Sequence, residues 1–256
     1  MGPADFFCAR AAAGGAVDEG GRVSDGRTAN GPEGVALFGA TGYSGREAAR
    51  LLHGHPHFRL AAVFGGSARE GVPLSSIHPS LRGLVDLPCR GLDTDGATSL
   101  DDAARRLRDE GVARTLLATP EEASIRIAPA LLRAGIRVVD LSGAFRLRAA
   151  SAYPEWYGFE HSAPDLLERA VYGLSEWERG AIARAALVAN PGCYPTAALL
   201  AILPLRRRDL LDTSAGRHQR RVGRLRSGAA AARGPAVLRG RGFDPPVRPT
   251  APPPPR

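Results

Sequence analysis

Residues 34–52 read GVALFGATGYSGREAARLL, and this stretch decides the fold class. Its beginning, 35–38, is a short continuous apolar run, which is typical of a buried strand in a parallel sheet. Its end, 46–52, has the periodicity of an amphipathic helix. The glycines between them are spaced GxxGxxG and let the backbone turn tightly from strand to helix. A strand, a glycine-rich turn and a helix in this order predict a dinucleotide-binding βαβ unit.

The same alternation continues along the chain. Further buried strands are predicted at 60–64, 115–118, 136–141 and 187–189, and further helices at 101–110, 124–134 and 196–205. Gly111 and Gly135 directly follow two of these helices, where a glycine commonly ends a helix. Strands that alternate with helices favour a parallel sheet covered on both faces. We therefore predict an α/β fold with a doubly wound, Rossmann-like parallel sheet.

The glycine turn has the composition of a phosphate-binding loop. Glycines let the backbone approach a pyrophosphate, whose charge is met by free N–H groups and the positive end of the helix dipole. We expect the cofactor to contact these residues of the turn: Gly39, Thr41, Gly42, Tyr43, Ser44 and Gly45. The alternative is a structural loop without a ligand, which the position between a strand and a helix disfavours.

The segment after the second predicted strand bears on the choice of cofactor. About 20 residues beyond the glycine turn, NAD enzymes usually carry an acid for the ribose hydroxyls. Here residues 65–70 read GGSARE, so Ser67 and Arg69 occupy this region. A hydroxyl and a guanidinium suit a 2′-phosphate, which predicts NADP (NADPH) as the cofactor. The alternative is that Arg69 is a solvated surface cation next to Glu70.

One cysteine has the setting of a nucleophile. Cys193 lies in the string NPGCYPT at 190–196, between the last predicted strand and the helix that follows. At a helix N-terminus, the dipole and unpaired N–H groups stabilise a thiolate and an oxyanion formed by its attack on a carbonyl. The neighbouring glycine and prolines indicate an exposed turn, against the alternative of a buried inert cysteine. Three widely spaced cysteines predict neither a disulfide framework nor a metal site.

These motifs together resemble one enzyme family. NPGCYPT resembles the active-site signature of the N-acetyl-gamma-glutamyl-phosphate reductases, and GATGYSG at 39–45 resembles their cofactor turn. Further family-like segments follow in the family's order: LSSIHP at 74–79, VDLSGAFRL at 139–147, WYGFEH at 156–161 and YGLSE at 172–176. The resemblance spans residues 34–212. It implies a dinucleotide-binding domain at 34–189 and, at 190–212, the start of a truncated α+β catalytic and dimerisation domain.

The resemblance also implies a reaction. Cys193 would displace phosphate from a small-molecule acyl phosphate, and NADPH would reduce the resulting thioester to N-acetylglutamate semialdehyde, a step of arginine biosynthesis in the cytoplasm. Ser142, Arg146 and Asn190 would bind the substrate, and the full-length family would form homo-oligomers. No histidine in a readable position matches the family's acid-base partner of the cysteine. A related aminoadipyl-phosphate reductase and an inactive cofactor-binding fragment remain alternatives.

The two ends of the chain differ from the middle. Residues 1–33 lack any helical or strand period, and we expect a disordered extension. Residues 213–256 hold ten arginines and one acid, a net charge of +9 against +8 for the whole chain, so residues 1–212 carry −1. No predicted recognition helix or basic face accompanies the basic tail, so we expect no nucleic-acid partner. No apolar run is long enough for a membrane helix, so we expect no membrane partner. The chain lacks lysine, and we expect the tail to be disordered and to result from a shifted reading frame.

Overall fold

A computed structural model of the chain describes residues 31–91, 97–208 and 210. All of them belong to one compact unit, Met1–Gly216, and a second unit, Arg217–Arg256, lies outside the described residues. The predictions of a disordered N-terminal extension, apart from residues 31–33, and of an aberrant tail after residue 212 also fall outside the described residues.

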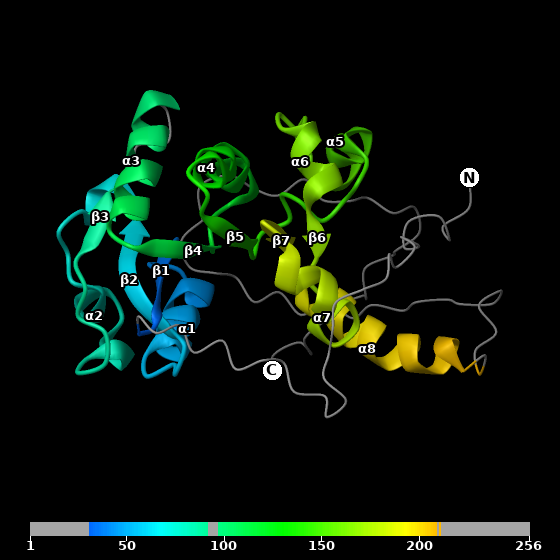
Figure 1. Ribbon diagram of the computed structural model, residues 1–256, viewed down its shortest axis with the longest axis horizontal. Helices are drawn as coiled ribbons and strands as arrows, with labels where there is room; N and C mark the ends of the chain where they lie inside the picture. Colours follow the sequence, from blue (N-terminus) through cyan, green and yellow to red (C-terminus); the bar gives the residue numbers. More distant parts are fainter. Residues whose placement is uncertain (1–30, 92–96, 209, 211–256) are drawn as a thin grey trace, which may run out of the picture. The chain divides into compact units, whose positions relative to one another are not determined.

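The described chain folds around one parallel sheet in the order β3-β2-β1-β4-β5-β7-β6 (Figure 1). The strands are β1 (Glu33–Phe38), β2 (Phe58–Gly65), β3 (Cys89–Gly91), β4 (Val112–Leu117), β5 (Arg137–Asp140), β6 (Val171–Tyr172) and β7 (Leu187–Ala189). Every strand pair in this sheet is parallel. The order reverses between β1 and β4, which creates the crevice at the carboxyl ends of the strands where such sheets bind ligands.

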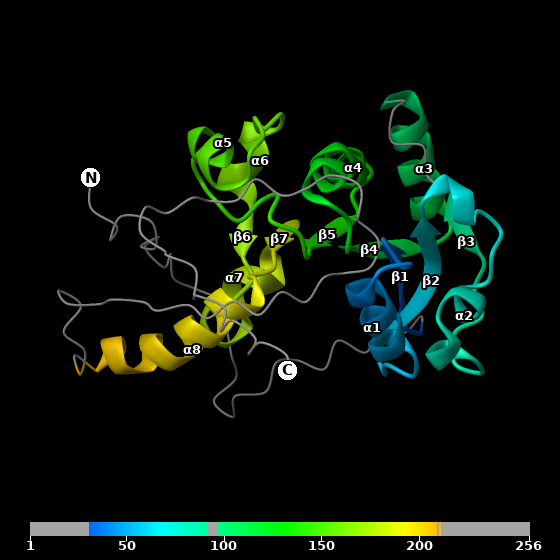
Figure 2. The same cartoon turned by 180° about the vertical axis from the view of Figure 1, so that it is seen from behind.

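Helices connect the strands. The longer ones are α1 (Tyr43–Leu52), α3 (Ala97–Asp109), α4 (Glu121–Arg133), α7 (Ser175–Arg184) and α8 (Cys193–Arg207). The shorter ones are η2 (Ser67–Arg69), α2 (Leu74–Ile77), η3 (Pro79–Leu81), η4 (Ala150–Ala152), α5 (Tyr153–Trp156) and α6 (Pro164–Arg169). Figures 1 and 2 agree that α1 and α2 lie on one side of the sheet and that α3 and α4 lie on the other.

Alternate residues of the central strands supply two hydrophobic cores. Phe38 and Phe64 stack with ring centroids 4.2 Å apart in the core that also contains residues of α3 and α4. Leu37 and Val63, one position earlier in each strand, belong instead to the core beneath α1 and α2. Because successive side chains of a strand point to opposite faces, both faces of β1 and β2 are buried. This confirms the predicted doubly wound sheet.

The predicted elements all form, with boundaries that differ by a few residues. The predicted strand at 115–118 begins at Val112, and the predicted helix at 196–205 begins at Cys193, so the thiol belongs to the first residue of α8. Gly111 and Gly135 have φ values of +80° and +73°, which explains why glycine ends these two helices. β3 and β6 were not predicted, because three and two residues are too few to show a period.

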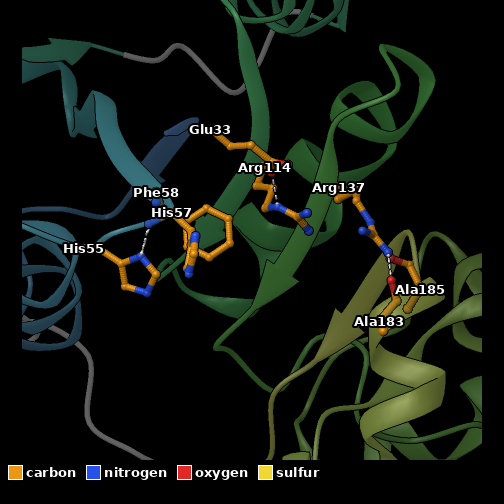
Figure 3. A network of polar contacts seen from close by, with 8 residues as sticks. All are labelled: Glu33, His55, His57, Phe58, Arg114, Arg137, Ala183 and Ala185. Atoms are coloured by element: carbon orange, nitrogen blue, oxygen red, sulfur yellow. Dashed lines mark hydrogen bonds and ion pairs between the residues drawn. The ribbon is translucent and has the colours of Figure 1, made fainter. Parts of the chain in front are cut away.

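Polar contacts join neighbouring elements at the amino ends of the strands (Figure 3). Sheets of this kind bind ligands at the opposite, carboxyl ends. Arg114 of β4 forms an ion pair with Glu33 of β1, Nε to Oε2, at 2.6 Å. His55 Nδ1 accepts hydrogen bonds from two backbone N–H groups at the start of β2. Arg137 of β5 donates to two carbonyl groups at the end of α7. All of these contacts lie away from the carboxyl ends of the strands.

Candidate functional site

The glycine turn after β1 is so tight that two of its glycines have no room for a side chain. A Cβ on Gly39 would lie 2.2 Å from the carbonyl oxygen of Ala118, and the φ of Gly39 is +76°. A Cβ on Gly45 would lie 2.2 Å from the carbonyl oxygen of Gly39. Gly42 differs, since a Cβ there would meet only one atom, at 3.5 Å, and the residue is exposed. Gly39 and Gly45 shape the turn, and Gly42 keeps its outer surface free of a side chain.

The start of α1 fits a pyrophosphate. Gly42 is its N-cap and contributes no side-chain hydrogen bond, and the first backbone bond of the helix runs from the Arg46 N–H to the Gly42 carbonyl. The N–H groups of Tyr43, Ser44 and Gly45 therefore precede the helical hydrogen-bond ladder. Such N–H groups and the helix dipole attract a phosphate. The residues present thus fit the phosphates of a dinucleotide.

The corner after β2 brings the predicted 2′-phosphate residues to the same edge. Ser67 and Arg69 lie on η2 and are exposed. The methyl group of Thr41 in the glycine turn packs against Gly65, 2.8 Å from where a Cβ would be. Glu70 turns toward β3, with Oε2 3.0 Å from the Cβ position of Gly91. Within the described ranges, Arg69 forms no ion pair, either with the neighbouring Glu70 or with any other residue.

A histidine that sequence reasoning assigned no role supports the glycine turn. His78 follows α2, and its Nε2 donates to the carbonyl oxygen of Ala40 at 3.0 Å. Ala40 is fully buried inside the turn, so this bond joins two segments 38 residues apart in the sequence. The family-like string at 74–79 pointed to this histidine, but nothing in the sequence linked it to Ala40.

A buried carboxylate organises the segment after β5. Asp140 is fully buried and accepts hydrogen bonds from the Ser142 hydroxyl at 2.8 Å to each carboxylate oxygen. Burial raises the pKa of Asp140, while hydrogen bonds from Ser142 and Ser124 and the charge of Arg146 oppose the rise. The Ser142 hydroxyl in turn accepts from the Ala144 N–H at 3.1 Å. The hydroxyl proton of Ser142, a residue predicted to bind substrate, is thus donated to Asp140.

Two aromatic side chains hold the same segment from its other side. The Tyr153 hydroxyl donates to the Ala144 carbonyl at 2.7 Å and accepts from the Leu147 N–H at 3.2 Å. His161 Nε2 donates to the same Ala144 carbonyl at 2.8 Å, and its Nδ1 accepts from the Ala163 N–H. Burial lowers the pKa of His161, which favours this neutral form. The segment from Ser142 to Leu147 is therefore fixed at both ends.

Arg146 connects this segment to the cysteine turn. Its Nε donates to the Asn190 carbonyl and its Nη2 to the Leu141 carbonyl, each at 2.8 Å. Its Nη1 lies 3.3 Å from the position that a Cβ on Gly192 would take. The Asn190 side chain donates to the neighbouring Pro191 carbonyl. Two of the three guanidinium nitrogens thus organise the backbone, and Nη1 is the nitrogen that faces the start of α8.

The two cysteines within the described residues differ sharply. Cys193 is exposed and is the first residue of α8, whose N-cap, Gly192, has no side chain. Cys89 is buried, and burial raises the pKa of its thiol while the charge of Arg69 partly offsets the rise. An exposed thiol at a helix N-terminus suits nucleophilic attack, whereas a buried, protonated thiol does not. Cys8 lies outside the described residues.

The structure therefore gathers the predicted site residues in two places. The glycine turn, Ser67 and Arg69 meet around the carboxyl ends of β1 and β2. Ser142, Arg146, Asn190 and Cys193 follow β5 and β7, two adjacent strands whose carboxyl ends share the same edge of the sheet. No group of side chains suited to a metal ion occurs among the described residues. Nor does any described helix have the length and apolar character needed to cross a membrane.

Comparison with known proteins gives the site a family. The family model of the semialdehyde dehydrogenase NAD-binding domain matches residues 34–185. A protein of Yersinia pestis named N-acetyl-gamma-glutamyl-phosphate reductase is 46% identical over 171 residues, which cover 66% of this chain and 48% of that protein. The Escherichia coli (strain K12) protein of the same name is 44% identical over 178 residues, 69% of this chain and 50% of that protein. The chain spans about half the length of the curated relatives it matches.

Solved structures resemble the chain more distantly. Aspartate semialdehyde dehydrogenase II from Vibrio cholerae is 19% identical, with a TM-score of 0.47, and the match covers 69% of this chain and 43% of that one. Aspartate semialdehyde dehydrogenase with NADP from Candida albicans is 13% identical, with a TM-score of 0.45, covering 70% of this chain and 48% of that one. The family model itself covers more than half of the 256 residues. The chain therefore belongs to the semialdehyde dehydrogenase NAD-binding domain family.

Proposed function

We propose that this chain carries the cofactor site and the nucleophile of an NADPH-dependent N-acetyl-gamma-glutamyl-phosphate reductase acting in arginine biosynthesis in the cytoplasm. Relatives at 44–46% identity with this name support the reaction. The single observation that carries the proposal is the exposed Cys193 thiol at the first residue of α8, one residue after Gly192, whose Cβ position lies 3.3 Å from Arg146 Nη1. A nucleophile and a cation at one turn suit an anionic acyl substrate.

The residues divide the work of the first step. The Cys193 thiolate attacks the acyl carbon and forms a carbon–sulfur bond. The bond between the acyl carbon and the bridging oxygen breaks, and inorganic phosphate leaves with that oxygen and the electron pair, which yields a thioester. Arg146 Nη1 provides positive charge for a carboxylate or phosphate of the substrate, while the other two nitrogens keep the turn in place. Backbone N–H groups at the start of α8 stabilise the oxyanion formed during the attack.

The second step needs a reductant. The nicotinamide cofactor, when bound, supplies the hydride that reduces the thioester to the aldehyde and releases the thiolate. The glycine turn holds its phosphates, and His78 keeps that turn in shape through Ala40. The proposed preference for NADPH rests on Ser67 and Arg69, since a free guanidinium attracts a 2′-phosphate more strongly than a ribose hydroxyl.

Formation of the thioester tests the nucleophile without requiring the second step. The chain is mixed with N-acetyl-gamma-glutamyl phosphate, and released phosphate and intact mass are recorded. We expect one phosphate and one acyl adduct per chain, located on Cys193, and neither with Cys193→Ala. Cys89→Ala is the matched control and should react as wild type. An adduct that persists in Cys193→Ala would contradict the assignment. The same assay with the aminoadipyl phosphate, which is one methylene longer, compares the reactivity of the two substrate lengths.

Titration with both cofactors tests the preference for NADPH. Arg69→Ala should weaken NADPH binding about tenfold or more, because a charge-assisted hydrogen bond contributes roughly 1.5–3 kcal/mol, and should leave NADH binding unchanged. Arg82→Ala removes another exposed arginine and serves as the charge-matched control. Tighter binding of NADH than NADPH by the wild-type chain would overturn the preference.

A further inference from the structure

One face of the parallel sheet is incompletely covered along β4 and β5. Leu117 and Val138 are fully buried and belong to the core that contains residues of α3 and α4. Their neighbours Leu116 and Val139, which point to the opposite face, are only partly buried. Because parallel sheets are normally covered by helices on both faces, we expect a further apolar element to cover this face.

A groove of about 620 Å³, called the α1 groove below, lies over this face beside α1. Six residues that form one stripe of α1, from Tyr43 to Leu52, line one side of it. The groove therefore follows the whole ten-residue helix, a length of about 15 Å at 1.5 Å per residue. Most of the residues that line the groove are apolar: Tyr43, Ala48, Leu51, Leu52, Phe58, Leu116 and Leu141. The α1 groove has the length and the character of a binding site for a short apolar helix.

The chain also carries an apolar helix without a core to pack on. Residues 193–205 of α8 contain no charged side chain, yet none of the 15 residues of this fully described helix is buried. A helix that is apolar all round is normally buried. The stretch 197–205 is about 14 Å long at 1.5 Å per residue, which matches the α1 groove. Its large aliphatic side chains are Leu199, Leu200, Ile202, Leu203 and Leu205.

We propose that two copies of this chain associate reciprocally, with α8 of each copy lying in the α1 groove of the other. Complete burial of one large aliphatic side chain removes roughly 60–120 Å² from water. One face of the helix presents about four such side chains, so one helix in one groove buries about 500–1,000 Å² over both surfaces. Two such contacts bury roughly 1,000–2,000 Å², whereas a stable interface buries about 1,200–2,000 Å². The reciprocal arrangement reaches this range, and a single contact does not.

A second copy is the favoured occupant because both surfaces belong to the same chain. A two-fold arrangement covers the helix and the groove of both copies at once and leaves no further copy to add. A helix of another protein in the α1 groove would leave α8 exposed. Cys193 precedes the apolar stretch by about one turn, so the contact does not need the thiol. The inference is therefore independent of the proposed reaction.

Sedimentation velocity of the full chain over a range of concentrations tests the association. The wild-type chain should form a dimer. Leu51→Glu places a carboxylate in the α1 groove and Leu200→Arg places a guanidinium on α8, and each should raise the dissociation constant of the dimer about tenfold or more, because an unpaired charge resists burial. Leu84→Glu, outside both surfaces, is the matched control and should stay within about twofold of wild type. Leu51, Leu84 and Leu200 are 59%, 43% and 36% exposed, so the single chain should keep its fold, which circular dichroism verifies.

A mixture of the two charged variants tests whether the contact is reciprocal. In a mixed dimer, the unchanged α8 of the Leu51→Glu copy meets the unchanged groove of the Leu200→Arg copy, so one of the two contacts stays intact. We expect the mixed dimer to form at lower concentrations than the dimer of either variant alone.

Several results would overturn the proposal. A wild-type chain that stays monomeric at every concentration would do so, and so would a dimer that Leu51→Glu leaves intact, since that pattern indicates contact between two copies of α8 alone. A mixture that associates no better than its components would exclude the reciprocal arrangement. If a charged variant does not fold, Leu51→Ala and Leu200→Ala replace it, and wild-type association of both would refute the contact. None of these results alters the expected thioester on Cys193.

Discussion

The Tyr153 hydroxyl holds the segment that carries Ser142 and Arg146, and its removal should have a measurable cost. In Tyr153→Phe the ring stays and only the oxygen is lost. The Ala144 carbonyl keeps its bond from His161, but the Leu147 N–H loses its partner. A buried polar group left without a partner costs roughly 1–3 kcal/mol. We expect the free energy of unfolding to fall by about 2 kcal/mol at pH 8.

The pH dependence gives this prediction a second signature. Burial raises the pKa of Tyr153 to about 12, from an ordinary value of 10.0. The folded protein therefore keeps this proton at pH values where the unfolded chain loses it. The associated stability is fully present below pH 10 and is lost as the pH rises through 12. Two pKa units correspond to about 2.7 kcal/mol, and about half of that is lost by pH 11.

Urea unfolding from pH 8 to pH 11 measures both effects. The wild-type chain should lose stability above pH 10 more steeply than Tyr153→Phe, so the gap between them narrows. Tyr194→Phe is the matched control, because Tyr194 is 51% exposed and its hydroxyl bonds to no described residue. Equal stability of Tyr153→Phe and wild type at pH 8, or parallel curves up to pH 11, would refute the reasoning.

Three further substitutions test other contacts by urea unfolding. Thr115 of β4 carries, among the described residues, the one buried side-chain oxygen without a hydrogen bond, so Thr115→Val should raise stability by about 1 kcal/mol, and any loss would contradict this. Gly45→Ala places a methyl group 2.2 Å from the Gly39 carbonyl oxygen and should cost about 3 kcal/mol, whereas Gly66→Ala, with open space around it, should stay within about 0.5 kcal/mol of wild type. Arg146→Lys keeps the charge but cannot bridge two carbonyls, so a loss of about 1–2 kcal/mol is expected, and unchanged stability would show that the bridge is not needed.

The sequence predicted the elements that have a strong local signal. Residues 35–38 are apolar without interruption because the strand they form is buried on both faces. The glycine turn was readable because φ of +76° at Gly39 and the contact at Gly45 exclude other residues there. Cys193 could be found because a strand and a Pro-Gly turn precede it in the sequence and a helix follows it. Each of these features depends on residues close together in the chain.

Tertiary structure alone decided how distant residues meet. Arg146 looked free to bind substrate, yet two of its nitrogens bridge Leu141 and Asn190, which the chain brings together through adjacent strands. The hydrogen bond from His78 to Ala40 joins two segments 38 residues apart, and no periodicity in the sequence indicates it. The physical reason is that hydrophobic patterns and turn residues specify local geometry, whereas a side-chain hydrogen bond depends on the packing of the whole sheet. The sequence thus determined the fold class and the candidate nucleophile, and the packing of β4, β5 and β7 decided which polar groups remain free to meet a ligand.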